Sequence, residues 1–358
     1  MPIGNHPGHR PSLIEYTAQI MREALSAREW IDQMPGEREL SQRLHVSRPT
    51  LRAALALLER EGLLSREPGR RRGIVKLARV PAQKFLRLIG LLAPGPIQEL
   101  APSAHLWLNS LQSHLRDKGY ELQIHSSRSC YSQSPERELA AFTHRLPAMV
   151  WVLFLGTKRM QRWFMDSGLP CVASGTPYSG VELPSVDLDH RATCRHAAAQ
   201  FLGRGHQCIA FLRQGPASAG DIESELGFLE AFRRNPGAAP IVVEHDGSPS
   251  GIRNQLKTLL RRTQKPTGFL VARAMPTLTV ASELIRRGYR LPHDAAVIGR
   301  DNDHFLDFFS PGIARYQVDS QLQAQRLARL VLQVARRETP RNPTVRLMPK
   351  FFPGESFG

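Results

Sequence analysis

The sequence predicts an α/β protein in which a small, mostly helical region precedes a larger region of doubly wound parallel sheets. Two observations lead to this fold class. Residues 12–76 contain three short helical patterns followed by two short strands around a tight turn. From about residue 86 onward, short apolar runs alternate with helical stretches, as expected for parallel strands joined by crossover helices. At 358 residues the chain is also too long for one ordinary hydrophobic core.

Composition and charge predict a soluble, cytoplasmic chain. Hydrophobic residues make up 41% and charged residues 22% of the sequence, and both are ordinary values for a globular protein. The longest apolar run, residues 147–156, is about half as long as a membrane-spanning helix, and residues 1–16 contain no apolar segment that could serve as a secretory signal. The net charge of +16 indicates an anionic partner. The excess is spread along the chain, however, so charge alone does not identify that partner.

The sequence contains no recognisable catalytic or metal-binding motif. Its four cysteines, Cys130, Cys171, Cys194 and Cys208, have no Cys-x-x-Cys spacing and no histidine at metal-ligand spacing. Phosphate-binding loops and nucleophile elbows are absent as well. We therefore expect reduced thiols, no metal, no cofactor and no catalytic residue.

Three helical patterns lie within residues 12–62. The first spans residues 12–27, and Gly36 separates it from a short second helix. Ser47 is expected to cap the third helix, and Gly62 to end it. The predicted inner faces are formed by Leu13, Tyr16, Ile20 and Leu25, by Leu40 and Leu44, and by Leu51, Leu55 and Leu58.

The third helix carries basic residues opposite its apolar stripe. With the leucines buried, Arg48, Pro49 and Arg52 emerge at its N-terminal end. A helix N-terminus attracts phosphate through its free N–H groups and its dipole, and forked guanidinium groups match guanine edges in a major groove. The pattern therefore predicts a recognition helix for double-stranded DNA.

A basic hairpin follows this helix. Residues 63–75 indicate two short strands around a glycine-flanked tip that contains Arg70, Arg71 and Arg72, and such side chains suit a minor groove or phosphate. Each arginine taken alone fits a solvated helix face or a solubilising turn. The ordered combination of helix–turn–helix and basic hairpin favours DNA binding.

These elements resemble the winged helix of GntR-family bacterial transcription regulators. The family pattern reads approximately P-S-E-R-E-L-A, V-S-R-x-T-V-R-x-A-L, E-G-L-L and a wing with G-x-G; here the segments are PGERELS, VSRPTLRAAL, EGLL and PGRRRG. The resemblance covers about residues 12–76, with Gly36 in place of the usual serine and a more basic wing tip. It implies that DNA is contacted by Arg38, Ser47, Arg48, Pro49, Thr50, Arg52, Gly69, Arg70, Arg71 and Arg72.

A linker, residues 77–85, leads from the DNA-binding domain, residues 1–76, into the α/β domain, residues 86–358. Buried parallel strands are predicted at residues 88–92, 149–154, 170–174, 208–212, 240–243, 267–272 and 295–299. The helical stretches between them include residues 105–119, 191–205 and 277–288. Sheets of this kind bind ligands beyond the carboxyl ends of their strands.

The α/β domain resembles the effector domains of LacI-type regulators. Residues 185–212 are similar to the family's V-x-x-D-N and L-x-x-x-G-H-x-x-I-A signature, and residues 286–303 to its G-x-x-V-P-x-D-V-x-V-V-G-F-D-D. The resemblance implies a two-lobed, periplasmic-binding-protein-like domain with a ligand cleft. On this basis lobe one is expected at residues 86–183 plus 312–338, and lobe two at residues 184–311 plus 339–358.

The family's cleft residues are kept unevenly. Asp301 keeps the acidic residue that accepts hydrogen bonds from ligand hydroxyls in the family, whereas Ser224 stands where arginine is usual and Arg273 where asparagine is usual. The resemblance implies effector contacts by Ser103, Trp107, Ser224, Asp246, Arg273 and Asp301. Two interpretations stay open, namely a cleft rebuilt for a different small molecule and a decayed cleft without a ligand.

Together these features predict a cytoplasmic, ligand-responsive transcription regulator. By analogy with the two families it is expected to be a repressor that binds a palindromic DNA operator as a homodimer. It is also expected to respond to a small, sugar-like effector. A ligand-independent DNA-binding regulator is the first alternative. An enzyme with a DNA-binding appendage is a weaker one.

The recognition helix yields a direct test. Replacing Arg48 or Arg52 with alanine should each cost about 1–3 kcal/mol of specific DNA binding and relax base preference, because a forked contact to a base edge is lost. Quantitative footprinting on a selected operator measures both effects. Unchanged footprints for both variants would contradict the recognition-helix assignment.

Overall fold

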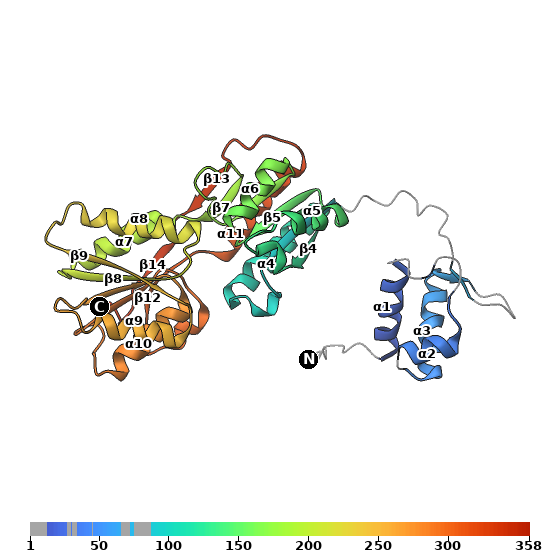
Figure 1. The fold of residues 1–358 in the computed structure, drawn as a ribbon, viewed down its shortest axis with the longest axis horizontal. Helices are drawn as coiled ribbons and strands as arrows, with labels where there is room; N and C mark the ends of the chain where they lie inside the picture. Colours follow the sequence, from blue (N-terminus) through green and yellow to red (C-terminus); the bar gives the residue numbers. More distant parts are fainter. Residues whose placement is uncertain (1–12, 27–29, 31–33, 45, 66–71, 75–86) are drawn as a thin grey trace, which may run out of the picture. The chain divides into compact units, whose positions relative to one another are not determined.

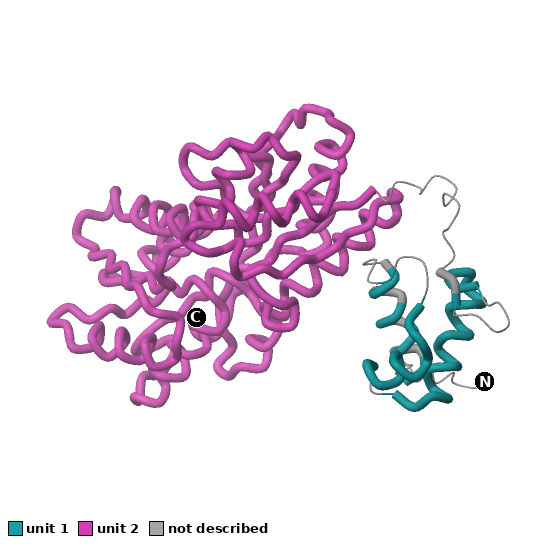
Figure 2. The backbone as a smooth tube through the Cα atoms, turned by 45° about the vertical axis from the view of Figure 1, so that its right-hand side comes forward, with its two compact units in different colours: residues 1–85 teal, residues 86–358 magenta. Residues whose placement is uncertain are grey.

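The computed structural model describes residues 13–26, 30, 34–44, 46–65, 72–74 and 87–358. The chain forms two compact units, residues 1–85 and residues 86–358, each of which is described by itself below (Figure 2). Within the described residues no helix is both long enough and apolar enough to cross a membrane.

The first unit is a small three-helix fold with a two-stranded ribbon. It consists of α1 (Leu13–Ser26), α2 (Glu37–Arg43), α3 (Arg48–Arg60), β1 (Leu64–Ser65) and β2 (Gly73–Ile74). The two strands are antiparallel, with Leu64 opposite Ile74. Its core is formed by Ala18, Met21, Met34, Leu40, Leu51, Ala54, Leu55, Leu58 and Leu64. The predicted inner faces of α2 and α3 agree with this core.

The inner face of α1 differs from the predicted one. Leu13 is exposed, and the buried positions of the helix include Thr17, Ala18 and Met21. The small side chains of Thr17 and Ala18 let α1 pack closely against α3. Leu25 of the predicted face packs against the core as expected, whereas Leu13 does not, because periodicity of the large apolar residues overlooked the small ones in the contact.

The second unit contains two six-stranded sheets, of which the first is entirely parallel (Figure 1). Its strand order is β13-β7-β6-β5-β3-β4. The strands are β3 (Arg87–Ala93), β4 (Tyr120–Ser126), β5 (Val150–Phe154), β6 (Cys171–Ser174), β7 (Ser185–Leu188) and β13 (Thr344–Leu347). One face is covered by α4 (Pro102–Arg116) and α11 (Ser320–Ala335), and the other by α5 (Glu136–Arg145) and α6 (Lys158–Ser167). Because both faces are covered, the central strands are apolar on both sides.

The second sheet has the order β14-β12-β11-β10-β8-β9, in which only β14 runs antiparallel to its neighbour. Its strands are β8 (Cys208–Gln214), β9 (Ala239–His245), β10 (Gly268–Val271), β11 (Ala296–Gly299), β12 (Ala314–Gln317) and β14 (Lys350–Phe352). Helices α7 (His190–Gly203) and α8 (Ala219–Phe232) cover one face, and α9 (Pro249–Leu259) and α10 (Ala274–Arg286) the other. Three single-turn helices complete the unit: η1 (Ile97–Glu99), η2 (Ser129–Tyr131) and η3 (His304–Phe308).

Strand pairing corrects the expected lobe boundaries. β7 pairs with β6 and β13 with β7, so both belong to the first sheet, whereas β12 pairs with β11 in the second. The expected division at residues 183/184, 311/312 and 338/339 had assigned each of these strands to the wrong lobe. The chain instead crosses between lobes after β7, after β12 and after β13. Edge and crossover strands are short, so the sequence pattern did not reveal their partners.

Close packing between α7 and α8 depends on Gly227. A Cβ atom at this position would lie 2.0 Å from the carbonyl oxygen of Arg191. Gly227→Ala should therefore destabilise the larger unit by about 1–3 kcal/mol, because the two backbones must separate. Thermal unfolding measures the loss. Gly203→Ala is the matched control, since its Cβ would meet nothing within 4 Å, and equal stability losses in both variants would contradict the prediction.

Candidate nucleic-acid interface and effector site

The N-terminal end of α3 is built by a capping residue and a proline. Ser47 has an extended backbone, and its hydroxyl accepts a hydrogen bond from the Thr50 N–H at 3.3 Å. Pro49 lies in the first turn, where its missing N–H costs nothing. Arg48, Pro49 and Arg52 are exposed while the leucine stripe of α3 is buried. The predicted basic end is therefore present on the surface of the unit.

Glu37 ties α2, α3 and the ribbon together. Its carboxylate accepts a hydrogen bond from Arg52 Nε at 2.8 Å and another from Arg72 Nη1 at 2.8 Å. Arg72 also donates to Glu59 of α3 through its Nε. The hydrogen bond from Arg72, followed by that from Arg52, holds the pKa of the Glu37 carboxyl below its ordinary value. Three segments far apart in sequence thus share one ion-pair cluster.

Arg72 does not match its predicted role. Its side chain is only 14% exposed and is engaged by Glu37 and Glu59, whereas Arg52 remains 66% exposed despite its contact with Glu37. Arg72 therefore anchors the base of the ribbon rather than presenting a free guanidinium group to DNA. No local sequence pattern indicates this role, because the two glutamates lie 35 and 13 residues away from Arg72.

The exposed residues gather around α3. Arg38 follows Glu37 directly and is exposed, and Glu37 contacts Arg52, so the start of α2 lies against the first turns of α3. Arg48 precedes Arg52 by about one helical turn on the same side. Gly69, Arg70 and Arg71 lie outside the described residues, so their contact with DNA stays a prediction.

In the larger unit, polar side chains meet at the carboxyl ends of β10 and β11. We call Asp221, Arg273, Arg300 and Asp301 the charge network. Arg300 is buried and donates from Nη1 to Asp221 Oδ1 at 2.9 Å. It also binds Asp301 in bidentate fashion, through Nε to Oδ1 at 2.8 Å and Nη2 to Oδ2 at 3.1 Å. Arg273 approaches Asp221 at 3.3 Å and Asp301 at 3.4 Å.

The charge network fixes the ionisation of its members. Burial alone would raise the pKa of the Asp221 carboxyl, but the Arg273 and Arg300 guanidinium groups hold it well below its usual range. The pKa of Asp301 is lowered in the same way, with Arg300 outweighing burial. Burial alone would lower the pKa of the Arg300 guanidinium group, but the Asp301 and Asp221 carboxylates raise it above its ordinary value. Two cations therefore face two anions, and the network carries no net charge.

Several predicted effector contacts are engaged or enclosed within the protein. Ser224 is fully buried and accepts a hydrogen bond from Arg300 Nη1 at 2.8 Å. Trp107 is buried in the core, where its ring lies 5.3 Å from that of Phe154. Asp246 is exposed and accepts from the N–H and hydroxyl of Ser248 at the start of α9. Effector contact by Ser224 and Trp107 is therefore opposed by their burial, whereas Arg273 and Asp301 remain partly exposed.

The prediction missed Arg300, although the sequence held a signal. The family pattern G-F-D-D has phenylalanine where this chain has Arg300. Position 224, where the family has arginine, is serine here, and Arg300 donates to the hydroxyl of this Ser224. Arg300, at the end of β11, thus places a guanidinium group beside the position on α8 where the family has its arginine.

Two contacts join the lobes beside the charge network. The backbone N–H of Ser103, in α4, donates to Asp303 Oδ2 at 3.3 Å. The hydroxyl of Tyr178, which follows β6 in the first lobe, lies near the backbone N–H of Ala219 at the start of α8. The predicted contribution of Ser103 thus takes the form of an interlobe contact through its backbone.

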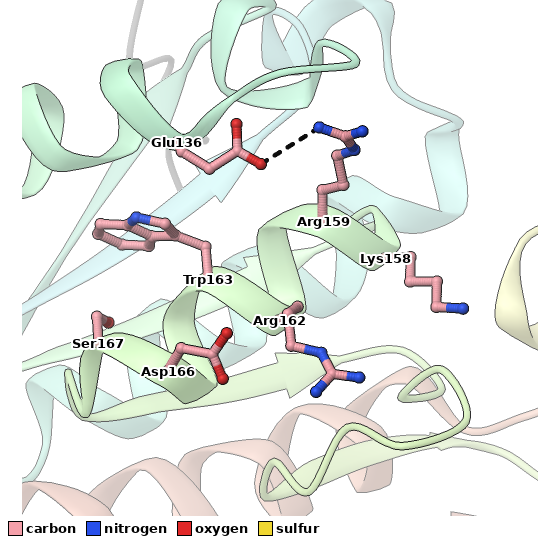
Figure 3. A pocket seen from close by; sticks show the side chains of 7 residues that line it. All are labelled: Glu136, Lys158, Arg159, Arg162, Trp163, Asp166 and Ser167. Carbon is pink, nitrogen blue, oxygen red and sulfur yellow. Dashed lines mark ion pairs between the residues drawn. The ribbon is translucent and has the colours of Figure 1, made fainter.

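Two hollows lie elsewhere on the unit. One of about 500 Å³ is formed by one face of α6 and by Glu136 of α5, which pairs with Arg159 at 3.5 Å (Figure 3). The other, of about 470 Å³, lies at the amino-terminal edge of β8 and β9. Among the described residues no cluster of three His, Cys, Asp or Glu side chains is arranged to hold a metal ion.

The Glu37 cluster predicts a specific pH dependence. A carboxyl whose pKa is lowered by folding adds stability above its ordinary value of 4.5, and that stability disappears as the pH falls through the folded-state pKa. Glu37→Gln should lower the stability of the first unit by about 1 kcal/mol at pH 7 and flatten its decline below pH 4.5. Hydrogen exchange of the α2 and α3 amides as a function of pH measures the stability of the first unit. The exposed neighbour Glu39 provides the control variant Glu39→Gln, and an identical acid profile in both would contradict the role of Glu37.

Two family models match the chain. "Bacterial regulatory proteins, gntR family" matches residues 16–74, and "Periplasmic binding protein-like domain" matches residues 182–357. The first range covers the described helices and ribbon of the small unit. The second covers most of the second sheet together with the charge network.

Known transcription regulators are similar to this chain in sequence or in fold. Catabolite control protein A of Staphylococcus aureus (strain MRSA252) is 19% identical over 242 residues, which are 66% of this chain and 71% of that protein. The solved "transcriptional regulator CelR-cellobiose complex" has a TM-score of 0.67 at 19% identity and covers 97% of this chain and 100% of its own. The solved structure of a regulatory protein of LacI family from Chloroflexus aggregans has a TM-score of 0.67 at 20% identity. The match covers 76% of this chain and 99% of that protein. The chain is therefore similar to bacterial transcription regulators: residues 16–74 match the gntR-family model, residues 182–357 match the periplasmic binding protein-like model, and its fold is similar to that of solved LacI-family regulators.

Proposed function

We propose that this DNA-binding regulator is a cytoplasmic repressor that binds a palindromic operator as a homodimer and is controlled by a neutral, sugar-like molecule. The observation that carries the DNA-binding part is the exposed basic end of α3, which Ser47 caps and Glu37 braces. A cytoplasmic location is proposed because bacterial operators lie on DNA in the cytoplasm. Repression, rather than activation, rests on analogy alone.

DNA binding would use the N-terminal end of α3 in a major groove. Arg48 and Arg52 supply forked donors for base edges, and Arg38 supports them from the neighbouring start of α2. The side chain of Arg52 can leave Glu37 at small cost, because it is largely exposed. Contacts by Ser47, Pro49 and Thr50 would position the helix on the phosphate backbone.

A homodimer is supported by an exposed apolar surface on the larger unit. Phe308 is 87% exposed, Met275 61% and Leu106 59%. Helix α10, which carries Met275, and η3, which carries Phe308, pack together in one small core cluster, and Leu106 lies one turn after Ser103, whose amide contacts Asp303 next to η3. Exposed apolar patches of this kind mark interaction sites. Two copies of the first unit would then read two half-sites, since one winged helix alone buries too little for selective binding.

The charge network supports a neutral effector. Its two arginines and two aspartates already balance, so an ionic ligand would leave a net charge in a partly buried site, at a considerable cost. A polyol can instead exchange hydrogen bonds with Arg273 and Asp301, which are the partly exposed members. The cellobiose named for the CelR complex belongs to this chemical class.

Regulation would follow from lobe closure. Ser103 and Tyr178 contact the second lobe beside the charge network, so a ligand that binds there alters the balance between open and closed lobes. In a dimer this change alters the spacing of the two DNA-binding units. Effector and operator must then weaken each other's binding to the same degree.

One observation favours a ligand-independent regulator as the second candidate. Both carboxylate oxygens of Asp301 already accept hydrogen bonds from Arg300, and Oδ2 accepts another from Arg273. The protein's own guanidinium groups thus fill the role that ligand hydroxyls would have. In that case the lobes stay closed without a small molecule, and operator binding is constant.

A thermal-shift comparison separates these candidates. Neutral sugars should raise the unfolding temperature of the chain by several degrees at saturation, whereas sugar phosphates should give a smaller shift. Arg273→Ala should abolish the shift while operator binding persists. Arg290→Ala, which removes an exposed ion pair with Asp294, is the control. Absence of any shift across sugars and polyols, with intact operator binding, would favour the ligand-independent regulator.

A further inference from the structure

Helix α8 is apolar on the side that faces solvent. Ile222, Leu226 and Leu229 are 44%, 41% and 38% exposed. Their spacing of four and three residues places them in one stripe along the helix. Singly exposed apolar residues are ordinary on a protein surface, but three aligned on one helix are not.

The opposite side of α8 is fully used by the fold. Gly220, Ser224, Gly227 and Phe228 are buried, and Gly227 lies against the backbone of α7. Figure 1 shows α7 and α8 side by side on one face of the second sheet. A helix that is apolar on both sides is typical of a buried element. The outer stripe therefore indicates that something covers α8.

Another surface helix of the same lobe provides a contrast. Helix α9 lies on the other face of the second sheet and exposes Arg253, Asn254, Lys257 and Thr258. These are the polar residues that an ordinary solvated helix face carries. The apolar stripe of α8 thus has no counterpart on α9.

Paired charges surround the stripe. Arg191 lies between Glu223, at 3.6 Å, and Glu230. Arg213 lies between Glu225, at 3.0 Å, and Glu244, at 2.7 Å. Arg195 and Arg233 also act on Glu230. Three arginines and four glutamates are therefore linked in ion pairs, and Arg233 and Arg234 follow at the end of the helix, so both signs occur in similar numbers, although the chain as a whole carries +16.

This balance argues against a nucleic acid or a strongly charged protein as the partner. An apolar centre with a polar, charge-balanced rim is the composition of a protein–protein interface. A surface that carries both signs equally is electrostatically complementary to another copy of itself. The symmetry of the stripe fits the same partner, since Leu226 lies near its middle.

We infer that the α8 stripe is a self-association surface that binds the α8 stripe of a second copy of this chain. Two antiparallel α8 helices related by a two-fold axis place Leu226 against its own copy and Ile222 against Leu229 of the second copy. Such an isologous contact closes on itself and forms a symmetric pair. It is distinct from the proposed dimer surface around Phe308, and it does not depend on DNA binding.

The contact is small. One stripe of three side chains provides less than the roughly 800 Å² per partner that a standard interface buries. It therefore forms appreciably only where the copies are already concentrated or linked, as when chains paired through the Phe308 surface offer two stripes at once. Two such pairs would make a four-chain assembly.

Analytical ultracentrifugation of the full chain tests the surface. With increasing concentration the wild-type protein should shift to an assembly of twice the mass, and Leu226→Glu should prevent this shift because it places charges at the two-fold axis. Asn254→Glu on α9 is the matched control and should behave as wild type. Circular dichroism and the unfolding temperature verify that each variant is folded. Equal masses for Leu226→Glu and wild type at every concentration would overturn the inference.

Cross-linking supplies an independent readout for a weak contact. The four native cysteines are buried, so Leu226→Cys adds the one exposed thiol in the described part of the chain. The two-fold arrangement brings this position against its own copy, within reach of a disulfide. Mild oxidation should yield a covalent pair in Leu226→Cys and not in Asn254→Cys. Equal cross-linking of the two variants, or none in either, would show that α8 does not face a second α8.

Discussion

A buried guanidinium group must be neutralised where it lies, and Arg300 sets this constraint for the larger unit. Leaving such a cation unpaired costs several kcal/mol, so Asp221 and Asp301 have to remain within reach of it. Asp221 belongs to the first turn of α8, and Asp301 follows β11. The network thereby fixes the carboxyl edge of the second sheet relative to the helix that covers it. The proposed effector site takes its chemistry from the same four side chains.

The smaller unit uses the same device in a more exposed form. Glu37 collects Arg52 from α3 and Arg72 from the ribbon, with Glu59 as a second acceptor for Arg72. In both units a carboxylate orients arginines that belong to different segments. The difference lies in burial: the first unit keeps Arg52 accessible for a partner, whereas the second encloses Arg300. Accessibility, rather than residue type, separates the contacting arginines from the supporting ones.

Sequence pattern was sufficient for the architecture and for the local arrangement at the N-terminal end of α3. The cap at Ser47, the leucine stripe and the exposed Arg48 and Arg52 follow from local spacing, and the structure shows all of them. Apolar runs likewise located the central strands. What failed depends on contacts distant in sequence: Arg72 meets a glutamate 35 residues away, and Arg300 meets Asp221 79 residues away. Periodicity cannot report such pairs, nor which sheet a short strand such as β12 or β13 joins.

The order in which the strands pair has a consequence for synthesis on the ribosome. The first sheet is completed by β13, at residues 344–347, and one of its faces is covered by α11, at residues 320–335. Most of the first lobe therefore leaves the ribosome long before the segments that cover it. The apolar face that α11 later covers is exposed while the second lobe is translated. Exposed apolar surface of this kind promotes aggregation. A nascent chain with this topology keeps that face uncovered until α11 and β13 have both emerged.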